Sequence, residues 1–105
     1  MEKEALLQYL KKRHTGYMNA ASSRSLEAVF HVGGKPIRKA VNELRCDGHP
    51  ICSDDNGYYY AETGTELNAT IRQLQSRIIK IAGAKNGLVR ASEQFTDNSQ
   101  TSLFV

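Results

Sequence analysis

The sequence predicts a small α+β protein, and three observations carry this prediction. Three segments in the first half have apolar residues at helical spacing, two short extended segments follow them, and a long helical segment with a Leu/Ile seam comes next. A chain of 105 residues has room for one small domain with a modest core. Its 40% hydrophobic and 24% charged residues are ordinary for a globular protein.

The first helix is predicted over residues 3–13. Leu6, Leu7 and Leu10 form an apolar stripe at helical spacing. The basic residues 11–13 suit the negative end of the helix dipole, and His14 and Gly16 follow as a stop. We therefore expect a supporting helix that buries its leucines.

A second helix is predicted after the small polar residues 17–22. Ser22 or Ser23 can cap its first free amides, and its apolar residues fall at i, i+3 and i+4. These core residues are Leu26, Val29 and Phe30. The helix is expected to end in a tight turn over residues 31–34, in which a glycine takes positive φ.

A third helix is predicted over residues 35–47. Pro36 suits its first turn, where the missing N–H costs nothing, while Ile37, Val41 and Leu44 repeat at i, i+4 and i+7. Two helices joined by a turn of about four residues form a helix-turn-helix motif.

After Gly48 the hydrophobic period changes from helical to extended. Residues 49–53 and 58–61 are the predicted strands, and the Asn56-Gly57 pair between them is a strong hairpin signal. Three helices followed by a β-hairpin wing predict a winged helix-turn-helix domain over residues 1–61.

A long helix is predicted over residues 62–87. Thr63 and Glu66 stand at capping-box spacing, and Asn86-Gly87 is its expected stop. Residues 88–105 are largely polar and are expected to form a flexible tail.

The long helix carries a heptad seam. Its members alternate by four and three and are Leu67, Ile71, Leu74, Ile78 and Ile81. Leucine at d with isoleucine at a favours two-stranded parallel coiled coils. We therefore expect a homodimer; the alternative is that this helix packs back on its own domain.

Residues 23–61 resemble the winged helix-turn-helix domains of bacterial and phage regulators of the biotin-repressor type. The stretch of residues 37–45 carries most of the resemblance, followed by Gly48, Pro50-Ile51 and Gly57-Tyr58-Tyr59. The resemblance implies duplex-DNA binding through a recognition helix at 35–47. The chain is similar to small phage or prophage regulators of transcription or replication.

The outward face of the third helix is basic. It is formed by Lys35, Arg38, Lys39, Asn42 and Arg45. Arg, Lys and Asn can read base edges in the major groove, whereas Lys35 and Arg45, near the helix ends, are better placed for phosphates. Asn56 at the wing tip is a further candidate for backbone contact, although Asp54 and Asp55 beside it repel phosphate.

The last residues resemble the short peptide by which bacterial replication and repair proteins bind the sliding clamp. The matching positions are Gln100, Ser102, Leu103 and Phe104; Thr101 departs from the usual leucine. Two apolar anchors after an amide suit a hydrophobic pocket. The alternative function is therefore a winged-helix adaptor that binds the clamp through residues 100–104 without specific DNA contact.

Other classes of function are disfavoured. No nucleophile elbow, phosphate-binding glycine loop or metal triad stands out, so we expect no enzyme and no cofactor. Cys46 and Cys52 bracket His49, but a zinc site would need His14 or His31 as well. RNA binding ranks below DNA binding, because stacking-aromatic modules are lacking apart from the tyrosines at 58–60.

The net charge of +3 is compatible with a polyanion partner, but does not require one. Residues 1–61 carry +2, residues 62–91 carry +3 and residues 92–105 carry −2. No apolar run is long enough for a membrane span, and the acidic start is unlike a secretory signal. A cytoplasmic location is the resulting expectation.

Overall fold

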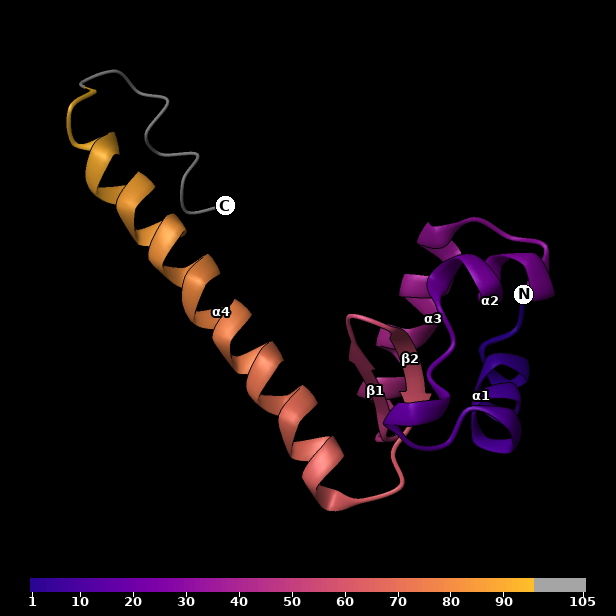
Figure 1. The fold of residues 1–105 in the computed structure, drawn as a ribbon. Helices are drawn as coiled ribbons and strands as arrows, with labels where there is room; N and C mark the ends of the chain where they lie inside the picture. The colour runs from indigo at the N-terminus through magenta and orange to yellow at the C-terminus, as the bar shows by residue number, and fades with distance from the viewer. Residues whose placement is uncertain (96–105) are drawn as a thin grey trace. The chain divides into compact units, whose positions relative to one another are not determined.

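A computed structural model describes residues 1–95 of the chain (Figure 1). The described part is α+β, with four α-helices and one antiparallel hairpin, which confirms the predicted class. The elements are α1 (Lys3–Arg13), a 3₁₀ turn η1 (Tyr17–Asn19), α2 (Ser23–Phe30), α3 (Gly34–Cys46), β1 (Ile51–Asp54), β2 (Gly57–Tyr60) and α4 (Gly64–Ser92). The chain forms two compact units, Met1–Ile71 and Arg72–Val105.

The core of the first unit lies among α1, α2, α3 and the hairpin. Leucines 6, 7 and 10 of α1 are buried, as their spacing predicts. From α3, the buried residues are Ile37, Ala40, Val41 and Leu44, and α2 contributes Leu26. The helical period therefore identified the inner faces of α1 and α3 correctly.

The inner face of α2 differs from the prediction at one residue. Leu26 is fully buried and Phe30 packs against the core, with its ring edge-on to Tyr9 at 5.5 Å between centroids. Val29, expected in the core, is exposed. Leu26 and Phe30 are four residues apart and face inward, which turns Val29 towards the edge of this short helix.

The turn between α2 and α3 uses histidine where glycine was expected. His31 takes the left-handed conformation at φ 56°, and its amide donates to the carbonyl of Glu27. Gly33, in contrast, is extended at φ −82° and precedes the first turn of α3. The left-handed residue is needed directly after the last helical residue, and that position belongs to His31.

The hairpin gains a third extended partner from the segment before α2. Strand β2 pairs with β1 in the register Ile51↔Tyr60 to Asp54↔Gly57. Tyr58 also exchanges two backbone hydrogen bonds with Ala21, of 2.8 and 2.9 Å. Gly57 makes this approach possible, because an added Cβ would overlap the carbonyl oxygen of Ala21.

Helix α4 begins with the predicted capping box. The Thr63 hydroxyl accepts from the Glu66 amide at 3.2 Å, and the Glu66 carboxylate accepts from the Thr63 amide at 3.3 Å. The first two turns of α4 belong to the first unit, so the predicted boundary after residue 61 lies inside that unit.

The other end of α4 lies beyond the predicted stop. The helix continues through Asn86 and Gly87 and ends at Ser92, which corrects both the helix end at 87 and the start of a tail at 88. Asn-Gly is a local stop signal only, and Leu88 and Val89 prolong the apolar side of the helix past it.

Candidate nucleic-acid interface

The outward face of α3 presents the basic and amide side chains that the sequence singled out. Lys35, Arg38, Lys39 and Asn42 are all exposed, because the opposite side of the helix is anchored in the core. Lys35, Arg38 and Asn42 are separated by three and four residues, so they follow one stripe along the helix. The two cations and the amide of this stripe can contact a polyanion.

Arg45 does not share this exposed stripe. Its Nε donates to the carbonyl oxygen of Ile51 at 2.8 Å, and a terminal guanidinium nitrogen donates to the hydroxyl of Ser53 at 3.0 Å. The side chain is half-buried and joins the end of α3 to strand β1. These bonds give Arg45 a structural role, and its contact with phosphate stays a prediction.

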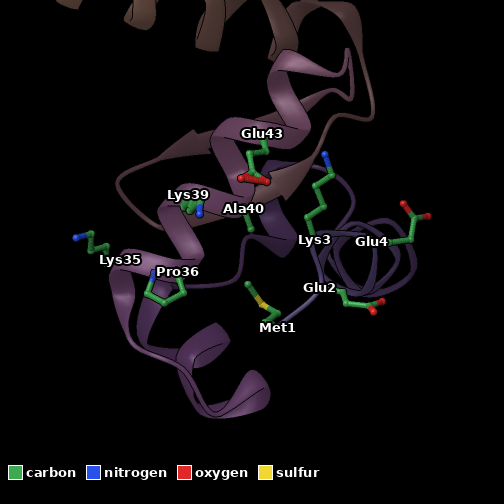
Figure 2. A pocket seen from close by; sticks show the side chains of 9 residues that line it. All are labelled: Met1, Glu2, Lys3, Glu4, Lys35, Pro36, Lys39, Ala40 and Glu43. Carbon is green, nitrogen blue, oxygen red and sulfur yellow. The ribbon is translucent and has the colours of Figure 1, made fainter.

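One edge of α3 borders a groove of about 670 Å³ beside the start of α1 (Figure 2). Its lining combines three lysines, three glutamates and three less polar residues: Lys3, Lys35, Lys39, Glu2, Glu4, Glu43, Met1, Pro36 and Ala40. The side chain of Lys35 points away from α1 in this view. The lysine and glutamate side chains of this lining are equal in number, so the groove as a whole attracts phosphate less than the exposed stripe does.

An ion pair links α1 to the end of α3. Lys3 Nζ lies 2.6 Å from Asp47 Oδ2, so the start of α1 is tied to the end of α3. This hydrogen bond raises the pKa of Lys3 and lowers that of Asp47. Both groups are largely exposed, so the pair contributes little to stability. Lys35, Arg38 and Lys39 are the exposed cations of α3, and none of them takes part in this ion pair.

The tip of the hairpin is acidic. Asn56 is exposed, as its candidate role requires, but Asp55 beside it is exposed as well. The carboxylate of Asp54 accepts from the Asn56 amide at 2.8 Å and so fixes the turn. Residues 51–60 contain no lysine or arginine that could offset these carboxylates against phosphate.

The two cysteines occupy opposite environments. Cys46 is a free thiol on the exposed side of α3, four residues after Asn42, whereas Cys52 is fully buried. Burial raises the pKa of the Cys52 thiol, and it raises that of the Tyr59 hydroxyl to about 12. Sequence reasoning did not place Cys46 on this face, although its spacing from Asn42 is a usable signal.

Within residues 1–95, no group of three or more His, Cys, Asp or Glu side chains is arranged to hold a metal ion. None of the helices in this range is long and apolar enough to cross a membrane.

Comparisons of the chain with protein-family models, curated proteins and solved structures gave no match.

The residues of the predicted heptad seam lie on one side of α4, which is a continuous helix. Ile71, Ile78 and Ile81 are exposed, while Leu67 and Leu74 are half-buried.

The clamp-binding candidates Gln100, Ser102, Leu103 and Phe104 lie outside the described residues.

Proposed function

We propose that this protein binds duplex DNA sequence-specifically, with α3 as the recognition helix in the major groove. The observation that carries the proposal is the exposed stripe of Lys35, Arg38 and Asn42 on a helix whose other side is anchored in the core. Arginine pairs with guanine and asparagine with adenine through two hydrogen bonds each. Lys35, near the helix start, contacts phosphate and sets the position of the protein.

The order of the elements supports the same proposal. Helices α2 and α3 are separated only by residues 31–33, and a two-stranded hairpin follows α3, as in a winged helix-turn-helix domain. In such motifs the second helix enters the major groove while the first crosses the DNA backbone.

The hairpin has a supporting role in this proposal. Its tip carries Asp54 and Asp55, and Arg45 bonds to its first strand, so the wing holds α3 and leaves DNA contact to the helix. The protein would then act as a small regulator of transcription or replication in a bacterium or prophage, as the resemblance of residues 23–61 implies.

Protection of Cys46 tests this geometry directly. The full chain is titrated with a pool of duplex fragments at low salt, and the alkylation rate of each cysteine is measured by mass spectrometry. We expect DNA to slow alkylation of Cys46 in proportion to the bound fraction, because this thiol lies on the exposed side of α3. Buried Cys52 is the internal control for an intact core.

Two results would contradict the proposal. Binding that leaves the Cys46 rate unchanged would place DNA on another surface. No binding at low salt would favour the alternative function, an adaptor that reaches the sliding clamp through residues 100–104. That alternative is favoured by one observation, the Gln100, Ser102, Leu103 and Phe104 pattern.

A further inference from the structure

The exposed apolar side of α4 lacks a partner within the described chain. Because α4 reaches Ser92, the heptad seam does not end at Ile81 but continues to Leu88, seven residues further on. Leu67, Leu74, Ile81 and Leu88 then occupy d, and Ile71, Ile78 and Lys85 occupy a. Ile71, Ile78, Ile81 and Leu88 are all exposed.

The residues of α4 outside the seam contribute little to the stability of an isolated helix. Residues 67–92 contain five basic residues and no Asp or Glu, so no Glu–Lys pairs can form along this stretch. Gly83 and Gly87 lower the helix propensity further. Because most helical stability in proteins comes from packing of an apolar face, this face needs a partner.

We propose that the partner is a second copy of this chain, aligned parallel and in register along α4. Isoleucine at a with leucine at d is the combination that favours two parallel strands. A single lysine at an a position, here Lys85, fixes register and oligomeric state at some cost in stability.

The charges of α4 fit this arrangement. In a parallel pair, position g of one helix faces position e of the next heptad in the other helix. Thr70, the first g position, is buried against the hairpin of its own chain. The g–e pairs after it join Arg77 to Ala82 and Ala84 to Val89, and neither brings two like charges together. Arg72, Lys80 and Arg90 occupy b, c and f, which point away from the seam.

A lipid surface fits the same face less well. Lys85 lies in the middle of the apolar stripe, between Ile81 and Leu88, and not at its edge, from which a lysine can reach the headgroups. Helix α4 is also anchored at its start by Glu66 and Thr70, which lowers the ordering cost of pairing with a second copy.

Two adjacent isoleucines give a matched test. Ile78 at a and Ile79 at b are similarly exposed, at 58% and 63%, but only Ile78 lies on the seam. In sedimentation equilibrium without DNA, we expect the full chain to have twice its monomer mass of 11.7 kDa. Ile78→Lys should give the monomer with the melting curve of the first unit unchanged, and Ile79→Lys should remain a dimer.

The orientation is tested by a disulfide. In a Cys46→Ser background, a Leu88→Cys chain should cross-link to its second copy on mild oxidation, because parallel helices bring the two position-88 side chains together. Antiparallel helices aligned over residues 71–88 would separate them by about 25 Å. Lys85→Ile should tighten association.

A monomeric wild-type chain would overturn the proposal, and so would equal effects of Ile78→Lys and Ile79→Lys. Cosedimentation of a monomeric chain with phosphatidylserine vesicles would assign the face to lipid instead. Failure of the Leu88→Cys cross-link in a dimer would overturn the parallel arrangement. None of these measurements involves DNA, so the result is independent of the proposed function.

Discussion

The hydroxyl oxygen of Thr70 accepts a hydrogen bond from the backbone amide of Ser53 at 3.3 Å. Thr70 is buried, although it lies on a helix whose other side chains are mostly exposed. This bond attaches the first turns of α4 to the hairpin, and Glu66 adds a bond to the Tyr17 amide at 2.8 Å. The N-terminal unit therefore includes the start of α4, and a truncation after residue 61 removes part of it.

Substitutions in the stripe of α3 should separate sequence reading from general affinity. We expect Arg38→Ala and Asn42→Ala to relax preference at single base positions, each by about 1–3 kcal/mol. Lys35→Ala should weaken binding to all sequences and flatten the dependence of log K on log salt by about one unit. Fluorescence anisotropy with matched and mismatched duplexes, repeated at several salt concentrations, measures both effects. Identical behaviour of all three variants would argue against base reading by α3.

Arg45→Ala should behave as a stability variant. Removing the guanidinium leaves the Ile51 carbonyl and the Ser53 hydroxyl without these donors, so we expect a loss of about 1–3 kcal/mol in the free energy of unfolding. Sequence preference on DNA should stay as in the wild type, because Arg45 is engaged with β1. Urea unfolding and duplex competition provide the two measurements. A variant that unfolds like the wild type, but whose DNA binding depends less on salt, would show that Arg45 contacts phosphate.

Gly57→Ala should be strongly destabilising. Gly57 has φ +133°, and an added Cβ would overlap the Ala21 carbonyl and approach Ser22 Cα to 2.8 Å. We expect a loss of about 3 kcal/mol or more. Gly48→Ala is the matched control, because Gly48 also has positive φ but has nothing within 4 Å of an added Cβ. It should lose only about 1–2 kcal/mol. Similar losses in both variants would show that steric overlap with Ala21 contributes nothing.

Stability should fall in acid partly through Glu66. Backbone amides of Glu62, Tyr17 and Thr63 donate to its carboxylate and hold its pKa below the ordinary 4.5. A carboxyl group with a lowered pKa stabilises the fold above 4.5, and this contribution is lost as the pH falls through the folded-state pKa. Glu66→Gln should therefore be less stable at neutral pH and lose less stability below pH 4.5.

Denaturant unfolding at a series of pH values measures this effect. Glu62→Gln is the control, because it removes a neighbouring carboxylate without touching the cap. Parallel pH profiles for Glu66→Gln and the wild type would show that Glu66 carries none of the acid sensitivity.

The C-terminal resemblance predicts a separate interaction. A peptide of residues 95–105 should bind a bacterial sliding clamp in the micromolar range, since two apolar anchors must offset the ordering of a free segment. Phe104→Ala should weaken binding most, Leu103→Ala next and Gln100→Ala least. Calorimetric titration measures this order, with the Leu103/Phe104 double-alanine peptide as control. Equal signals from wild-type and control peptides would exclude the motif.

The sequence by itself determined the parts of this protein that depend on neighbouring residues. The bounds of α1, the inner faces of α1 and α3, and the Thr63–Glu66 cap follow from helical spacing and local hydrogen bonding. Lys35, Arg38 and Asn42 were placed outward by the same period, because a helix buried on one side must expose the other.

Only the tertiary structure decided which long-range partners the remaining residues have. Arg45 could be assigned to β1 and Thr70 to the Ser53 amide only once strand and helix had been brought together. Likewise, the role of Gly57 depends on Ala21, thirty-six positions earlier. A periodic pattern predicts the direction in which a side chain leaves its own helix or strand. The residues that this side chain contacts are determined by how separate elements pack together.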